Sequence, residues 1–155
     1  MPLRVGATIP DFRAPDAEGR AWTRADLAGR PFVLFFYPAD ETPGCVTEAC
    51  AYRDAWEAFR DLGVPVLGVS RDPPERHRAF AQRRQLPFTL LSDPDGRMRD
   101  AFGAWMLGRL PRRVSYLVDA EGRVAAVFDS ALRPGAHARE MLAATERLTA
   151  GRRAP

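Results

Sequence analysis

The chain of 155 residues contains two cysteines, Cys45 and Cys50, whose thiols are the side chains best suited to chemistry. A thiolate is a nucleophile and can be oxidised reversibly, so this pair could support redox or nucleophilic chemistry. Two cysteines are too few for a disulfide scaffold, and with only His77 and His137 as imidazole ligands they make a poor zinc site. We therefore expect no bound metal and no cofactor. The alternative is that both cysteines are small buried apolar residues without chemistry.

The composition indicates a globular chain. Hydrophobic residues make up 46% and charged residues 28%, which excludes disordered, collagenous and membrane-spanning classes. The longest apolar run, residues 32–37, is far shorter than the ~18 residues that span a bilayer. The first residues lack the apolar stretch of a secretory signal, so we expect a cytoplasmic location without membrane association.

The charge pattern argues against a nucleic-acid partner. The net charge of +3 arises from 23 basic and 20 acidic residues scattered along the chain. No basic segment alternates with aromatic residues as a nucleic-acid groove would require.

Hydrophobic periodicity predicts an α/β fold. Residues 32–37 and 64–69 form apolar runs typical of buried strands, and residues 43–62 between them have helical spacing. Further expected elements are a helix over 74–85, a strand over 88–91, a short helix over 98–103, a hairpin of 114–118 and 123–128, and a closing helix over 135–149. This order predicts a central mixed sheet with helices on both faces. We expect one domain over residues 3–150 and a disordered tail over residues 151–155.

Cys45 lies where the first strand leads into the first helix, which is where ligands bind in open α/β sheets. Thr42 before Pro43 is a helix start signal and makes Cys45 the third helical residue. Its sulfur would lie beside free backbone N–H groups and the positive end of the helix dipole, which favour the thiolate. Gly44 leaves room for a small substrate to approach the backbone.

Three other polar residues have less specific interpretations. Glu48 is expected to be an acid in the first helical turn that suits the dipole, with bonding within the site as an additional role. His77 and His137 are interpreted as capping or surface histidines rather than acid–base catalysts.

The pattern Pro38-x-x-x-Thr42-x-x-Cys45 resembles the active-site motif of peroxiredoxins. The wider segment, Tyr-Pro-x-Asp-x-Thr-Pro-Gly-Cys-x-x-Glu-Ala-Cys, is similar to the peroxiredoxin Q subgroup, also called bacterioferritin comigratory protein. The resemblance continues in the expected order through residues 6–12, 68–72, 86–93, 113–119 and 134–137.

This resemblance implies a thioredoxin-like fold and a peroxidase in antioxidant defence that reduces hydrogen peroxide and organic hydroperoxides. It implies that Cys45 is the peroxidatic cysteine and that Cys50 is the resolving cysteine, which forms an intramolecular disulfide recycled by thioredoxin. By motif position, Thr42 and Arg113 complete the peroxide site, and Pro38 shapes and shields the pocket. The Arg113 guanidinium can favour the thiolate and hold the peroxide oxygen on which negative charge develops.

Arg113 is chosen over the neighbouring Arg112 because of its separation along the sequence from residues 116–119. The stretch over residues 105–113 is shorter than the resemblance to the subgroup leads us to expect. The loop that shapes the entrance to the substrate site can therefore differ from the corresponding loop in that subgroup. Because both cysteines lie in one short segment, resolution needs no second chain, and we expect a monomer.

Two other functions stay open on the residues alone. A thioredoxin-like thiol-disulfide oxidoreductase normally uses Cys-x-x-Cys, whereas four residues separate the cysteines here. A non-enzymatic redox sensor would share the first oxidation step with a peroxidase.

Overall fold

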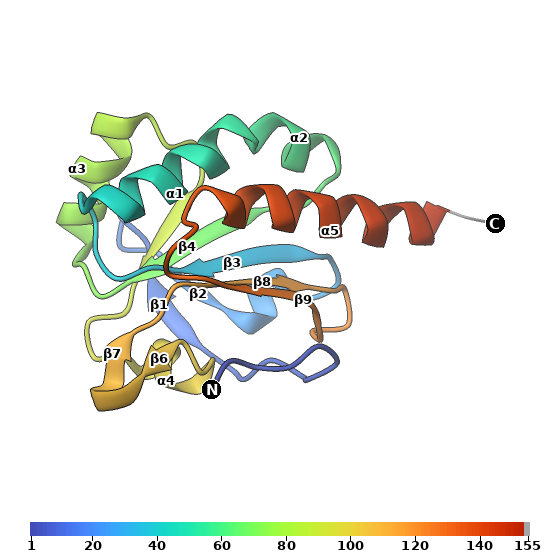
Figure 1. The fold of residues 1–155 in the computed structure, drawn as a ribbon, viewed down its shortest axis with the longest axis horizontal. Helices are drawn as coiled ribbons and strands as arrows, with labels where there is room; N and C mark the ends of the chain where they lie inside the picture. Colours follow the sequence, from blue (N-terminus) through green and yellow to red (C-terminus); the bar gives the residue numbers. More distant parts are fainter. Residues whose placement is uncertain (154–155) are drawn as a thin grey trace.

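The computed structural model describes residues 1–153, and a mixed β-sheet forms its centre (Figure 1). The strands of this sheet are β3 (Phe32–Phe36), β4 (Val66–Ser70), β5 (Thr89–Ser92), β8 (Val114–Val118) and β9 (Val124–Asp129). They pair in the order β5-β4-β3-β8-β9. β3, β4 and β5 run parallel, whereas β8 is antiparallel to both of its neighbours. The predicted central mixed sheet is confirmed.

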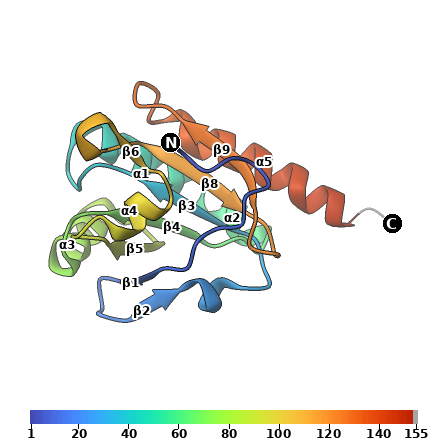
Figure 2. The same cartoon turned by 90° about the horizontal axis from the view of Figure 1, so that it is seen from below.

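Other elements cover both faces of the sheet, but unevenly (Figures 1 and 2). One face carries α1 (Pro43–Asp54), α2 (Trp56–Asp61), α3 (Pro74–Arg84) and α5 (Ala136–Arg153). The other face carries the hairpin of β1 (Arg13–Pro15) and β2 (Ala21–Thr23), the 3-10 turn η1 (Arg24–Leu27) and the short helix α4 (Arg97–Ala101). A small hairpin of β6 (Trp105–Met106) and β7 (Leu110–Pro111), joined by the 3-10 turn η2 (Leu107–Arg109), precedes β8.

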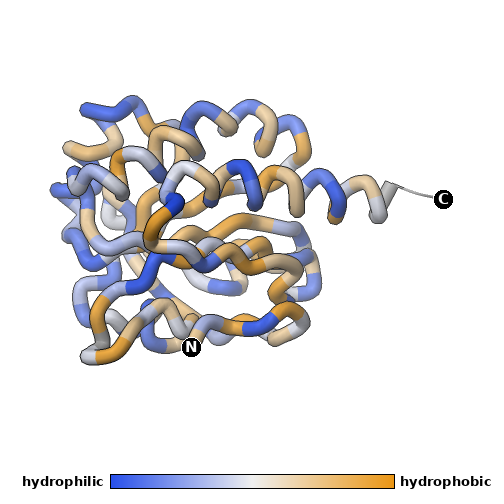
Figure 3. The backbone as a smooth tube through the Cα atoms, in the orientation of Figure 1, coloured by the Kyte–Doolittle hydropathy of each residue, from blue (hydrophilic) through white to orange (hydrophobic). Residues whose placement is uncertain are grey.

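Two apolar cores lie on the two sides of the sheet. Side chains alternate between faces along a strand, so Phe32, Leu34 and Phe36 of β3 enter one core, while Val33 and Phe35 enter the other. Figure 3 shows the corresponding hydrophobic stretches along the central strands. The continuous apolar run of β3 is therefore explained by burial on both faces.

Most predicted bounds agree with the structure to within about two residues. The predicted helix over 43–62 is instead two helices, α1 and α2, separated by Ala55. The backbone turns there with φ −93° and ψ 0°, and the break has no local signal because alanine is a strong helix former.

The closing helix α5 is longer than predicted. It continues to Arg153, so residues 151–153, which were expected to belong to a tail, are helical. The remainder of the expected tail, residues 154 and 155, lies outside the described part of the chain. Across residues 1–153, no helix combines the length and apolar character needed to cross a membrane.

The sheet brings three separate segments to one place. In the register of β3 and β8, Phe36 lies opposite Val114, so Arg113 is adjacent to the loop that leads from β3 into α1. β9 ends opposite the same point, and the chain then enters α5. The elements α1, β8 and α5 therefore lie together near the carboxyl end of β3 (Figure 1).

Candidate active site

The thiol of Cys45 lies at the start of α1. Thr42 is the N-cap residue with an extended backbone, Pro43 is the first helical residue and Cys45 is the third. The Cys45 side chain is buried, with 1% of its surface exposed. The free N–H groups of the first turn and the positive end of the helix dipole surround this position.

Arg113 supplies a buried cation to the sulfur. Its Nη2 lies 3.5 Å from the Cys45 Sγ, and its Nη1 donates to Oε1 of Glu48 at 2.7 Å. Burial alone would lower the pKa of Arg113, but the charges of Glu48 and Cys45 raise it above its ordinary value. The guanidinium is therefore positively charged and held between a sulfur and a carboxyl group.

Arg112 points elsewhere and does not contact the thiol. Its Nε and Nη2 donate to the Asp129 carboxylate at 3.0 Å and 2.7 Å. Alternation along β8 explains the difference, because Arg113 shares a face with Ser115, whereas Arg112 shares the opposite face with Val114. The structure thus brings Arg113, and not its neighbour, to Cys45.

The Arg113 guanidinium lies beside Gly44, where a side chain would otherwise project. A Cβ atom at this position would lie 2.9 Å from Nη2 of Arg113. The expected approach of a small substrate to the Gly44 backbone is not tested by this contact and stays a prediction. The missing side chain lets the guanidinium reach the sulfur.

Replacing Gly44 by alanine is expected to displace the Arg113 guanidinium and to slow peroxide reduction by up to about 10²-fold, as small misplacements do in active sites. Stopped-flow measurement of peroxide loss checks this. Gly135→Ala is a matched control, because a Cβ there meets Thr47 at an ordinary 3.7 Å. If Gly44→Ala reacted as fast as this control, the packing argument would be wrong.

The Thr42 hydroxyl makes a hydrogen bond within the loop that precedes α1. It makes no hydrogen bond that caps the helix, and it donates its single proton to the carbonyl of Ala39 at 2.9 Å. This bond closes the loop that precedes α1. The hydroxyl oxygen retains its capacity to accept a hydrogen bond.

The two remaining residues expected in the site are Pro38 and Cys50. Pro38 is half-buried in the loop after β3 and lines a small cleft with Pro111 and Arg112. Cys50 is partly exposed within the same helix as Cys45, and both thiols are free. Helical geometry therefore separates the two sulfurs in this form of the protein.

Glu48 is not an acid of the first helical turn. It lies in the second turn, fully buried, so the first-turn interpretation is wrong, whereas the additional role is seen in its hydrogen bond from Arg113. Burial raises the pKa of Glu48 to about 8, although the Arg113 charge and hydrogen bond lower it.

The two histidines are also placed differently from expectation. His77 and His137, expected at caps or on the surface, are both fully buried. Helical spacing could have indicated this, because His77 lies one turn before the buried Phe80 and His137 one turn before the buried Met141.

His137 joins a buried polar network that sequence reasoning missed. Tyr52 donates to the Ser115 Oγ at 2.6 Å, and that oxygen lies 2.9 Å from Nδ1 of His137. Nε2 of the same ring lies 2.8 Å from the Ser130 carbonyl. Burial lowers the pKa of His137 to about 4.

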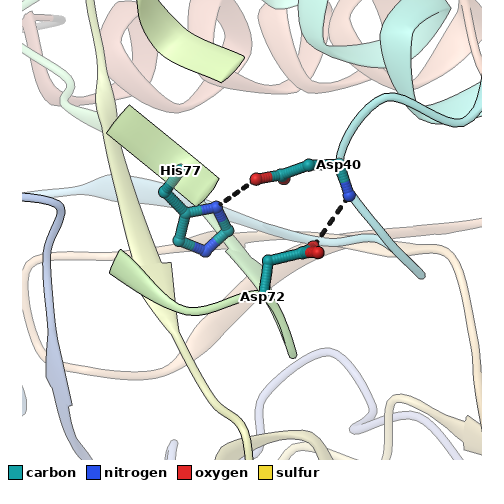
Figure 4. A group of neighbouring side chains, drawn as sticks. All are labelled: Asp40, Asp72 and His77. Atoms are coloured by element: carbon teal, nitrogen blue, oxygen red, sulfur yellow. Dashed lines mark hydrogen bonds and ion pairs between the residues drawn. The ribbon is translucent and has the colours of Figure 1, made fainter. Parts of the chain in front are cut away.

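His77 belongs to a second buried cluster, with Asp40 and Asp72 (Figure 4). Its Nδ1 lies 2.7 Å from Oδ2 of Asp40, and its Nε2 lies 3.0 Å from the carbonyl of Leu91. Asp72 Oδ2 accepts from the Asp40 N–H at 2.7 Å and from the Ser70 hydroxyl at 2.6 Å. Three potential metal-ligand atoms lie within 4.8 Å of one another, but these hydrogen bonds occupy them. The cluster ties the loop after β3 to α3 and β5.

Comparison with known proteins identifies the family. The AhpC/TSA family model matches residues 5–127. The chain is 44% identical over 139 residues to peroxiredoxin Q of Sedum lineare, covering 88% of this chain and 75% of the relative. It is 41% identical over 142 residues to peroxiredoxin Q of Populus jackii, covering 90% and 67%.

Solved structures agree with the sequence relatives. Peroxidoxin BcpB of Mycobacterium tuberculosis superposes with a TM-score of 0.87 at 35% identity, over 94% of this chain and 98% of that chain. The bacterioferritin comigratory protein of Xanthomonas campestris, described for its alkyl peroxide reduction activity, superposes with a TM-score of 0.82 at 30% identity, over 89% and 92%. The thioredoxin-like fold expected from the sequence is therefore confirmed.

The expected cytoplasmic location is corrected by the same comparison. The peroxiredoxin Q relatives from Sedum lineare, Populus jackii and Gentiana triflora are chloroplastic proteins. These chloroplastic relatives contradict the assignment of this chain to the cytoplasm.

The family match, the relatives and the buried thiol beside an arginine all indicate the same chemistry. The chain belongs to the AhpC/TSA family and, within it, to the peroxiredoxin Q and bacterioferritin comigratory protein group, and it is a thiol-dependent peroxidase that acts on peroxides and is reduced by a thioredoxin-like reductant.

Proposed function

We propose that Cys45 is the peroxidatic cysteine of an enzyme that reduces hydrogen peroxide and organic hydroperoxides. One observation carries this assignment: the Cys45 sulfur, at the start of α1, lies 3.5 Å from a buried guanidinium nitrogen of Arg113. A thiolate there is stabilised by a permanent cation and by the helix N-terminus.

In the first step the Cys45 thiolate attacks the terminal oxygen of the peroxide. A sulfur–oxygen bond forms, the oxygen–oxygen bond breaks, and the leaving hydroxide or alkoxide takes up a proton to become water or an alcohol. Sulfur is oxidised to a sulfenic acid and the peroxide is reduced. Arg113 stabilises the oxygen on which negative charge develops.

The other residues support this step. Arg113 reaches the sulfur because Gly44 has no side chain, and Glu48 fixes the guanidinium from its other side. Pro38, half-buried in the loop after β3, is proposed to shape and shield the substrate pocket. Thr42 closes the same loop through its bond to Ala39, and donates to a bound peroxide when its hydroxyl rotates away from that carbonyl.

In the second step the Cys50 thiolate attacks the sulfur of the Cys45 sulfenic acid. A disulfide forms, the sulfur–oxygen bond breaks, and the released hydroxide takes up a proton to give water. A thioredoxin-like dithiol then supplies two electrons and restores both thiols. Support for Cys50 comes from its place in the same helix as Cys45 and from its partial exposure.

The disulfide requires α1 to unwind. Residues five apart in a helix have Cα atoms about 8.6 Å apart on opposite sides, whereas a disulfide tolerates about 4.4–6.8 Å. Amide hydrogen exchange over residues 43–55 is therefore expected to be faster in the disulfide form, with lower helicity by circular dichroism. Equal protection in both forms, with the disulfide verified by mass, would exclude this conformational change.

A peroxidase assay tests the proposed function. Purified protein is expected to remove hydrogen peroxide catalytically with thioredoxin and for one turnover without it. A thiol-disulfide oxidoreductase would reduce protein disulfides without consuming peroxide, and a redox sensor would stop after one oxidation even with thioredoxin. A comparison of several peroxides then defines the substrate preference.

We also propose that residues 3–150 form one domain that acts as a monomer. Two cores that share the same sheet support the single domain. The monomer is supported by the location of both cysteines in α1, because resolution then needs no second chain. Light scattering of the reduced protein tests this assignment.

A further inference from the structure

Glu41, the residue before the N-cap of α1, has a strained backbone. Its φ of 63° lies in the left-handed region, which residues other than glycine and asparagine seldom adopt. Such a conformation persists only where surrounding contacts hold it. The contacts of Glu41 therefore decide whether the chain enters α1 in this way.

Two arginines of α3 hold this strained residue. Nη1 of Arg83 donates to Oε2 of Glu41 at 2.7 Å, while Nε and Nη2 of Arg84 donate to Oε1 at 3.2 Å and 3.0 Å. The Glu41 side chain is 23% exposed, against 66% for Arg83 and 37% for Arg84. Each carboxylate oxygen is thus bound by a different arginine, and dissolved salt can reach these ion pairs. We call this group of three side chains the Glu41 clamp.

Asp40 fixes the chain just before the clamp. Its side chain is fully buried, with Oδ1 accepting from the Tyr37 hydroxyl at 2.6 Å and Oδ2 lying 2.7 Å from Nδ1 of His77 (Figure 4). Its N–H donates to the Asp72 carboxylate at 2.7 Å. We expect a residue with this many buried contacts to keep its place when α1 unwinds.

Tyr52 and Arg53 fix the far end of α1. Tyr52 is fully buried and stacks on Phe35, with ring centroids 4.3 Å apart. Arg53 donates from Nη1 to the carbonyl of Arg84 at 2.8 Å, which ties this end of α1 to α3 as well. The segment that can rearrange between the fixed points is therefore residues 41–51, and it contains both cysteines.

We propose that the Glu41 clamp restrains the unwinding of α1 and thereby sets the rate at which Cys50 resolves the Cys45 sulfenic acid, so that Glu41 is a positioning residue for the resolving step. This inference rests on the proposed roles of Cys45 and Cys50. While the clamp is closed, the helical form predominates and keeps Cys45 beside Arg113. When the clamp opens, the Glu41 backbone relaxes to an unstrained conformation and the first turns of α1 come apart.

Glu41→Gln tests the clamp, because it keeps the length of the side chain and the strained backbone but removes the charge. Rapid quenching and mass spectrometry after one equivalent of hydrogen peroxide should show the disulfide forming about three- to tenfold faster, the effect of losing two partly exposed ion pairs. The first oxidation of Cys45 should change by less than about twofold, because the helical form still predominates. A general loss of structure would instead slow the first step.

Salt provides a second measurement on the same proteins. Raising the salt concentration from about 0.05 M to about 0.5 M screens exposed ion pairs. Disulfide formation should therefore accelerate in the parent enzyme and stay nearly constant in Glu41→Gln. An equal salt response in the two proteins would show that another ion pair controls the step.

The same clamp can be opened from α3. The double variant Arg83→Gln/Arg84→Gln should reproduce the faster disulfide formation, and adding Glu41→Gln to it should give no further acceleration, since the three side chains act as one unit. Full additivity of the two changes would contradict the clamp. The matched control Glu146→Gln changes an exposed glutamate of α5 and should keep the parent rate.

Amide hydrogen exchange of the reduced protein measures the clamp without cysteine chemistry. Residues 44–50 should exchange about three- to tenfold faster in Glu41→Gln than in the parent, while Tyr52 keeps its protection. Equal exchange in both proteins would overturn the clamp, and faster exchange with an unchanged rate of disulfide formation would overturn its role in resolution. If the parent formed no disulfide, the proposed role of Cys50 would fail, whereas the exchange rates would still decide whether the clamp restrains α1.

Discussion

Replacing Cys45 by serine is expected to abolish peroxide consumption. A serine hydroxyl is hardly ionised near neutral pH and cannot form a sulfenic acid, so neither the helix N-terminus nor Arg113 can rescue the reaction. Stopped-flow measurement of peroxide loss checks this result. An unchanged rate in Cys45→Ser would rule out the proposed nucleophile.

Cys50→Ser is the matched variant for this prediction, because it changes the second thiol of the same helix. It is expected to react once with peroxide at a normal rate and then to stall in the presence of thioredoxin, since no disulfide can form. Loss of the first oxidation in Cys50→Ser, with retention in Cys45→Ser, would reverse the two assignments.

Replacing Arg113 by alanine is expected to slow peroxide reduction by about 10² to 10³-fold or more, the usual effect of removing an oxyanion donor. Arg113 is buried and contacts the sulfur, so its loss also leaves the Glu48 carboxyl group without its cation. Measurement of the second-order rate constant for hydrogen peroxide provides the test.

Arg112→Ala is the control for this substitution. Arg112 is bound to Asp129 on the other side of β8, and a surface ion pair of this kind contributes little, so the rate constant should change by less than about threefold. A large loss of the rate constant in Arg112→Ala, together with a nearly unchanged rate constant in Arg113→Ala, would show that the assignment is displaced by one residue.

Much of the fold could be predicted from the spacing of apolar residues and the alternation of side chains along strands. The apolar runs of β3 and β4 and the helical spacing between them were sufficient for the mixed sheet and for the position of Cys45 at the start of α1. The same alternation places Arg113 on the face of α1, because Ser115 lies there and Val114 does not. Local patterns with a period of two or 3.6 residues are therefore reliable guides to which side chains meet.

Contacts that depend on packing between distant segments were not predictable in this way. Gly44 accommodates the guanidinium of Arg113, the residue that precedes β8, and no feature of residues 42–50 indicates this contact. Thr42 has a carbonyl three residues earlier as its partner, which competes with the capping role that its position suggests. Glu48 was assigned to the first turn by its nearness to the helix start, although its environment comes from Arg113 and His137.

The histidines illustrate how a polar residue on an apolar helix face can be misread. His137 and His77 share helix faces with buried Met141 and Phe80, yet their polarity favoured a surface assignment. Both satisfy their ring nitrogens with buried oxygen atoms of other segments, which makes burial possible.

The most direct test of the central claim is to identify the first atom that peroxide oxidises. Reduced protein is mixed with one equivalent of hydrogen peroxide, quenched at increasing times with a sulfenic acid trap, digested and analysed by mass spectrometry. The trapped adduct is expected first on the peptide that contains Cys45, followed by a disulfide between Cys45 and Cys50. An adduct that forms first on Cys50, or peroxide loss without oxidation of either cysteine, would contradict the account.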